Sequence, residues 1–258
     1  MRNRVIPKRL AVFFSSAALL LFSVLCSAAG LVLVRTARLP EAPAVQTAES
    51  VPQNSVPLLV VDPGHGGQDG GASAEGGDVL EKDLNLAVSG NVADLCAVFG
   101  LPVRLTRTED VLLYDYFGDL DDYTGKQKTY DLKNRLRIAE ESGARLLVSV
   151  HMNQFPQASC RGFQVYYSPN DPDSRVAAQR IQSAARSFLD RENDREIKPA
   201  TSAIYLLKHV RIPAVLAECG FLSNPEERAL LVSPDYRRRL AAVLFVPAAD
   251  YLAEQIHD

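Results

Sequence analysis

Apolar residues along this chain occur in two patterns. Short, mostly apolar runs begin at Leu58 (LLVV), Ala144 (ARLLVSV) and Ile212 (IPAVLA). Polar residues, Gly or Pro bound them, which is typical of buried strands. Helical periodicity, with apolar residues three or four positions apart, covers residues 81–100, 130–143 and 174–192. Because strands and helices alternate, the pattern predicts a single α/β domain of three layers, with a mostly parallel, twisted sheet flanked by helices.

The same patterns predict two more strands and the buried faces of the helices. Residues 101–107 form a short strand, and 162–168 alternate in polarity as a half-covered strand does. The expected buried faces are Leu84, Val88, Val92, Leu95 and Phe99 in the first helix, Leu132, Leu136 and Ala139 in the second, and Val176, Ile181, Ala184 and Phe188 in the third. Asn224 before Pro225, and Ser233 before Pro234, predict the starts of two further helices.

The first part of the chain predicts a membrane anchor and a linker. Residues 1–9 are basic, and the apolar stretch of residues 10–34 is long enough to cross a bilayer. The basic flank should remain in the cytoplasm, which places residues 58–258 on the extracytoplasmic face of the membrane. Residues 35–57 are rich in Pro and Ala and predict an extended linker. A cleaved signal that exports the protein is the alternative, because small residues occur in the segment CSAAG.

Composition narrows the functional classes. With a net charge of −3 and a hydrophobic content of 47%, the chain predicts a globular protein that does not bind nucleic acid. Its 4 cysteines are scattered, which predicts free or buried thiols rather than a disulfide framework. A bridge between Cys160 and Cys219 remains open.

Chemistry-bearing residues occur where three of the predicted strands end. His65, His151 and Glu218 each end or closely follow an apolar run, and ligands of parallel α/β sheets bind outside the carboxyl ends of the strands. Glu81 follows a glycine-rich loop that can bring its carboxylate back beside His65. Two imidazoles and a carboxylate are a typical catalytic zinc set, and a hydrolase also needs a base. The four residues therefore predict three ligands and one base, with the assignment of Glu81 and Glu218 still open.

Four motifs around these residues resemble a known family. DPGHGG with His65, EKD with Glu81, SVHMN with His151 and AECGFLSNP with Glu218 occur in the order found in zinc-dependent N-acetylmuramoyl-L-alanine amidases. The resemblance covers about residues 58–252. It implies one zinc ion bound by His65, Glu81 and His151, with Glu218 as the catalytic base. It also implies hydrolysis of the amide between the lactyl group of N-acetylmuramic acid and L-alanine in peptidoglycan.

The resemblance extends to a subgroup and to partners. The segments VLEKD and GFLSNPEE, and the single anchor, are most similar to germination-specific members from spore formers, which contribute to muramic-lactam formation in the spore cortex. The implied partners are the glycan strand and stem peptide of peptidoglycan, and the membrane through the N-terminal helix. An activating protein partner is also compatible with the sequence.

Three alternative functions remain open. The chain could be a cysteine hydrolase that uses Cys219 with His151, a zinc peptidase acting on the stem peptide, or a non-catalytic wall-binding relative. Arg135 is expected to form an ion pair on a helix surface, although contact with a substrate carboxylate is an alternative. The tyrosine-rich segment 114–130 could grip glycan or peptide, dock a partner, or form an ordinary surface loop.

Overall fold

The computed structural model describes residues 58–74 and 76–255. The elements in chain order are β1 (Leu58–Pro63), α2 (Glu81–Phe99), β2 (Val103–Leu105), α3 (Gln127–Glu141), β3 (Ala144–Asn153), β4 (Gln164–Tyr167), α4 (Asp173–Phe188), β5 (Lys198–Pro199), α5 (Tyr205–His209), β6 (Ala214–Phe221), α6 (Pro225–Leu231) and α7 (Pro234–Glu254). Within this described part of the chain, no helix is long and apolar enough to span a bilayer. The expected anchor at 10–34 and linker at 35–57 lie outside the described residues.

The six strands form one mixed sheet in the order β2-β1-β3-β6-β4-β5. Neighbouring strands are parallel from β2 to β6, whereas β4 pairs antiparallel with β6. The short β5, which the sequence pattern did not predict, pairs parallel with β4. A parallel return needs a crossover of a dozen or more residues, usually a helix. The ten residues from Gln154 to Phe163 contain no helix, so β4 starts at the edge where β3 ends and runs back. The prediction of a mostly parallel sheet therefore holds for four of the six strands.

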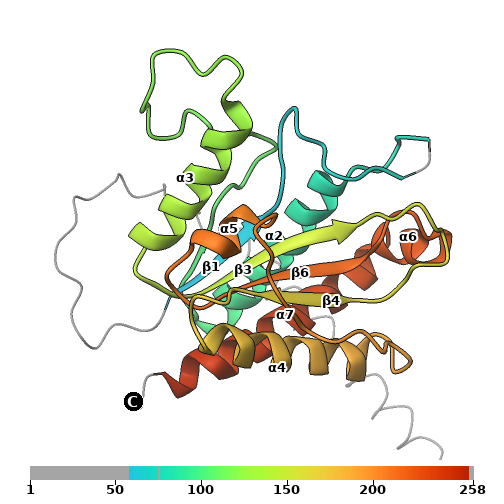
Figure 1. The fold of residues 1–258 in the computed structure, drawn as a ribbon. Coiled ribbons are helices and arrows are strands. Elements are labelled where there is room, and N and C mark those ends of the chain that lie inside the picture. The colour runs from blue at the N-terminus through green and yellow to red at the C-terminus, as the bar shows by residue number, and fades with distance from the viewer. Residues whose placement is uncertain (1–57, 75, 256–258) are drawn as a thin grey trace, which may run out of the picture. The chain divides into compact units, whose positions relative to one another are not determined.

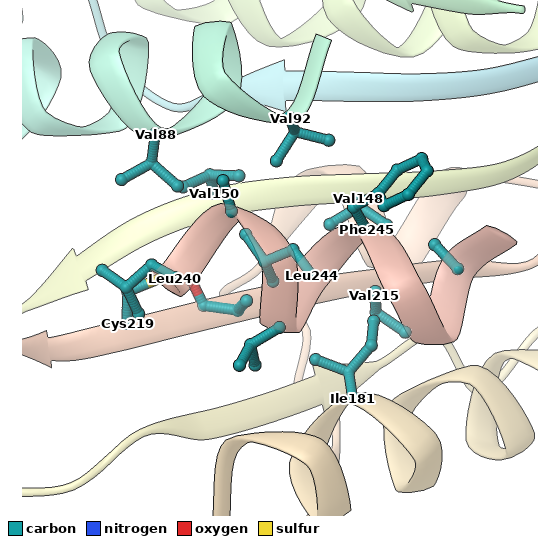
Figure 2. Close-up of a cluster of buried hydrophobic side chains, with 14 of the residues drawn as sticks. Val88, Val92, Val148, Val150, Ile181, Val215, Cys219, Leu240, Leu244 and Phe245 are labelled. Carbon is teal, nitrogen blue, oxygen red and sulfur yellow. Dashed lines mark hydrogen bonds between the residues drawn. The ribbon is translucent and has the colours of Figure 1, made fainter. Parts of the chain in front are cut away.

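Helices cover both faces of this sheet, as predicted (Figure 1). On one face α2, α4 and α7 enclose the larger core, in which Val88, Val150, Ile181 and Leu244 meet between helices and sheet (Figure 2). On the other face α3 and α5 cover a smaller core that includes Val60, Leu147 and Leu207. Successive residues of a strand point to opposite faces, so each central strand contributes to both cores.

The predicted buried faces of the helices are partly wrong. In α4, Val176 and Phe188 are 43% and 72% exposed, and the buried side consists of Ser174, Ala177, Ala178, Ile181, Gln182 and Ala185. Phe99 at the end of α2 is 71% exposed. Small residues let α4 approach the sheet closely. Gln182 accepts through Oε1 from Val165 N of β4 and donates through Nε2 to Phe163 O just before β4. Apolar periodicity misses a face built from alanines and a hydrogen-bonded polar residue.

Helix α3 departs further from its apolar pattern, because its buried side is largely polar. Asp131, Asn134 and Arg135 are buried with Ile138 and Ala139, whereas Leu132 and Leu136 are only partly buried. At α6 the Asn224 side chain accepts from Glu226 N and Glu227 N, which confirms the predicted cap. The Ser233 side chain makes no such bond at α7.

Candidate metal centre

The turn after β1 places His65 at the carboxyl edge of the sheet. His65 has a φ of 62°, a left-handed conformation that non-glycine residues rarely adopt. Backbone hydrogen bonds between Gly66 and Asp69 close the turn in both directions. Gly66 and Gly67 also have positive φ values, so the turn needs glycine at both positions.

Two buried arginines hold the backbone of this turn. Arg135 Nη1 and Nη2 donate to Pro63 O at 2.7 Å and His65 O at 2.5 Å. Arg107 Nε and Nη2 donate to Pro63 O and Gly64 O, both at 3.0 Å. Only 2% of Arg135 is exposed, so its expected place in an ion pair on the helix surface is wrong.

The charge of Arg135 is balanced by two carboxylates inside the domain. Its Nη1 lies 2.7 Å from Asp62 Oδ1, and its Nε lies 2.8 Å from Asp131 Oδ2. Asp62 also accepts from Thr106 and Ser149, each at 2.6 Å. Burial alone would raise the pKa of Asp62, but the Arg135 charge and the two hydroxyls outweigh it and lower this pKa to about 2.

His65, Glu81 and His151 converge at one point although they are far apart in sequence. His65 Nε2 lies 3.3 Å and His151 Nδ1 2.9 Å from Glu81 Oε1. One potential ligand atom from each residue lies within 4.8 Å of the others, as predicted for a metal centre. Glu81, only 3% exposed, is fixed by bonds from Ala72 N at 2.7 Å and Met152 N at 3.1 Å.

Two glycines make room for these ligands. A Cβ at Gly64 would lie 2.2 Å from the His151 ring, and one at Gly71 would lie 2.5 Å from Glu81 Oε2. Real Cβ contacts are not that short, so the His151 ring and the Glu81 carboxylate occupy space that any larger residue would fill. The glycine-rich segments around the first strand thus serve the close approach of backbone to ligands.

Asp69, which sequence reasoning missed, orients the first histidine. Its Oδ2 lies 3.0 Å from His65 Nδ1, which leaves Nε2 directed toward Glu81. Metal-ligating histidines commonly place the second ring nitrogen against a carboxylate in this way. Burial alone would lower the pKa of His65, but Glu81 and Asp69 outweigh it and raise this pKa. The same negative surroundings favour a bound cation, so the donor set fits a divalent metal with imidazole and carboxylate ligands.

Glu218 lies beside this cluster on the neighbouring strand. His151 and Glu218 are register partners of β3 and β6, so both side chains point to the face covered by α3 and α5. They line one cleft of about 280 Å³ with His65 and residues of those two helices. Burial, with a further contribution from the Glu81 charge, raises the pKa of Glu218 to about 7 against the opposing effect of the histidines. Its Oε2 is buried and has no hydrogen-bond partner among the described residues.

Cys219 does not take part in this site. It is 1% exposed and lies in the core on the opposite face of the sheet, under α7 (Figure 2). Burial raises the pKa of its thiol well above the ordinary value, so a reactive thiolate is disfavoured. Cys96, Cys160 and Cys219 are all free thiols, which confirms the expectation for these three and excludes the bridge left open above. The alternative of a cysteine hydrolase is therefore wrong.

Comparisons with known proteins agree with this geometry. A family model described as N-acetylmuramoyl-L-alanine amidase matches residues 59–245. The germination-specific N-acetylmuramoyl-L-alanine amidase of Bacillus subtilis (strain 168) is 34% identical over 198 residues, which cover 77% of this chain and 81% of that protein. The structure of the CwlD amidase from Clostridioides difficile in complex with the GerS lipoprotein is similar, with a TM-score of 0.71 and 37% identity over 77% of this chain and 99% of that chain. The amidase AmiC2 of Nostoc punctiforme has a TM-score of 0.64 and 28% identity, covering 78% and 99% of the two chains.

Proposed function

This chain belongs to the N-acetylmuramoyl-L-alanine amidase family and is a hydrolase of that class; from this premise we propose how its residues carry out the reaction. We propose that His65, Glu81 and His151 bind one zinc ion and that Glu218 is the catalytic base. The bond cleaved joins the lactyl group of N-acetylmuramic acid to L-alanine. One observation carries the proposal: potential ligand atoms of the three donor residues lie within 4.8 Å of one another, and two of these residues, His65 and His151, line one cleft with Glu218.

The donor set favours zinc over harder cations. Two imidazole nitrogens and one carboxylate suit a zinc site that keeps a position for water, whereas Mg²⁺ and Ca²⁺ prefer oxygen ligands throughout. When bound, zinc supplies Lewis acidity to the amide carbonyl and to a water molecule, whose pKa falls to about 7. The chain itself supplies a fixed ligand geometry and a proton acceptor.

Glu218 is suited to proton transfer at neutral pH. A general base works best when its pKa lies near the working pH, and burial raises the pKa of Glu218 to about 7. The unpartnered Oε2 accepts the proton of the attacking water. The protonated carboxyl then donates that proton to the departing nitrogen of L-alanine, so the leaving group departs as a neutral amine.

The cellular setting is proposed from the relatives. The similarity to a germination-specific amidase supports a role in germination. We extend this proposal to the spore cortex, where the resemblance of the motifs implies that amide cleavage contributes to muramic-lactam formation. The similar amidase of Clostridioides difficile was solved with a lipoprotein, which supports a protein partner for this chain as well. We place the domain outside the cytoplasm, with residues 10–34 as a retained anchor or a cleaved signal.

Digestion of purified peptidoglycan by the full-length protein tests the proposal. We expect new amino-terminal L-alanine, abolished by a chelator and restored by zinc. Glu218→Gln should keep its zinc, measured by elemental analysis, and lose activity by about 10²- to 10⁴-fold, the usual contribution of a general base. Glu226→Gln, an exposed carboxylate nearby in sequence, is the matched control and should remain active. Release of amino termini from within the stem peptide would instead identify a peptidase.

A further inference from the structure

A second cavity lies next to the metal centre. It has a volume of about 480 Å³ and is lined by Gly67, Gln68, Asp110, Val111, Leu112, Leu113, Tyr114, Asp115, Tyr116 and Gln127. We propose that this cavity, here called the tyrosine cavity, binds saccharide units of the glycan strand. The stem peptide of the substrate then occupies the cleft lined by His65, His151 and Glu218, here called the metal cleft. The proposal rests on the amidase function proposed above.

The tyrosine cavity is within reach of the scissile bond. Gly67 and Gln68 line it, whereas His65 and Asp69 of the same turn line the metal cleft. The Cα atoms of His65 and Gly67 can be no more than about 7.6 Å apart, since each step along the chain spans about 3.8 Å. The tyrosine cavity and the metal cleft therefore lie on either side of one short turn. A polymer that is cleaved at the metal must extend beyond the metal cleft.

The lining suits a neutral saccharide. Tyr114 and Tyr116 offer aromatic surface, with Tyr116 51% exposed, against which the apolar face of a sugar ring can pack. Gln68 and Gln127 offer amide donors and acceptors, and Asp115 offers carboxylate acceptors for hydroxyl and acetamide groups. A few polar groups around an apolar surface are typical of small-molecule sites.

The charges around the tyrosine cavity are compatible with a neutral ligand. None of the described residues that line it is a lysine or arginine, and one of its two aspartates, Asp110, is paired with Lys82 Nζ at 2.6 Å. The metal cleft is more strongly charged, because its lining includes four carboxylates together with Lys128 and Arg135. Charged groups of the stem peptide therefore meet both signs of charge in the metal cleft, whereas the uncharged glycan needs no ionic partner in the tyrosine cavity.

The wall of the tyrosine cavity is held in place before any ligand binds. Asp110 accepts from Gly67 N at 2.7 Å and pairs with Lys82 Nζ at 2.6 Å, which ties the far wall to the histidine turn. On the other side, Leu113 N donates to Asp131, and Asn134 donates to Leu113 O, so the loop is attached to α3. A site that is already ordered loses less conformational entropy on binding.

Saturation-transfer NMR with tetra-N-acetylchitotetraose tests the proposal on the full-length protein. This neutral N-acetylglucosamine tetramer contains no lactyl amide, and a chelator is included so that catalysis plays no part. We expect binding to the wild type and about tenfold weaker binding to Tyr116→Ala, the size expected when an aromatic anchor is removed. Tyr116→Phe keeps the ring and should bind normally. Phe188→Ala removes an aromatic residue of α4 that is 72% exposed, more than Tyr116, and this variant should also bind normally.

Each result separates this proposal from the amidase assignment. Absence of tetramer binding to the wild type, or equal binding to Tyr116→Ala, would overturn the saccharide site even if digestion releases L-alanine. Binding that depends on Tyr116 would support the saccharide site even if digestion fails. On polymeric peptidoglycan, Tyr116→Ala should raise KM with little change in kcat, because Tyr116 contacts substrate away from the reacting atoms.

Discussion

Removal of the Arg135 charge should destabilise the whole domain. Arg135→Met replaces the guanidinium with an unbranched apolar side chain and thereby limits the effect of an empty cavity. Asp62 and Asp131 would then be buried carboxylates without their cation, at relative exposures of 2% and 3%. Four backbone or carboxylate contacts at 2.8 Å or less would be lost as well, to Asp62, Asp131, Pro63 and His65.

The expected loss is about 3–5 kcal/mol in the free energy of unfolding, as found when one partner of a buried ion pair is removed. Natural domains have unfolding free energies of about 5–15 kcal/mol, so the variant would keep only part of its stability. The equilibrium between folded and unfolded protein would shift by more than about a hundredfold.

Urea unfolding of the full-length protein at neutral pH measures this difference. Arg137→Met is the matched control, because Arg137 lies on the same helix and pairs with Asp119 and Glu141 at partly exposed positions. An exposed pair contributes at most about 1 kcal/mol, so this control should unfold nearly as the wild type does. Asp62→Asn added to Arg135→Met should recover part of the loss, since it removes one of the uncompensated charges.

Equal unfolding midpoints for Arg135→Met and Arg137→Met would refute the reasoning. That result would mean that water or a rearrangement solvates Asp62 and Asp131 when the guanidinium is absent. A stability loss that Asp62→Asn does not relieve would place the cost in the backbone bonds to Pro63 and His65 instead of in the charges.

Two further predictions concern the same region. Gly64→Ala should lower zinc affinity by about 10- to 100-fold, because the new Cβ displaces the His151 ring; Gly90→Ala, with open space around its Cβ, should keep full zinc in the same competition against a chelator. Asp62 has a folded-state pKa of about 2, below its ordinary 3.8, so its contribution of about 2 kcal/mol is present at neutral pH and is lost as the pH falls from 4 through 2. Urea unfolding across that pH range should show this loss in the wild type and a flatter profile in Asp62→Asn; parallel profiles would contradict the assignment.

Local pattern was sufficient for the elements that carry the site. The runs ending near His65, His151 and Glu218 are the strands β1, β3 and β6, which lie next to each other in the sheet. Their carboxyl ends lie at one edge of the sheet because the three strands are parallel. Identification of the strands in the sequence was therefore enough to predict that these residues lie close together. The resemblance to the amidase motifs then assigned Glu81 to the metal, and the structure brings its carboxylate to both histidines.

Tertiary structure alone decided what holds the site. Arg135 looked like a surface residue because its helix neighbours are polar, yet it is buried against Asp62, which lies 73 residues earlier in the chain. Asp69 likewise gave no periodic signal, and its role follows from the left-handed turn that directs its carboxylate to His65. The face of α4 and the direction of β4 also depend on which surfaces meet in the folded domain. Periodicity reports the burial of apolar side chains, whereas a buried polar contact depends on partners that are distant in sequence and adjacent only after folding.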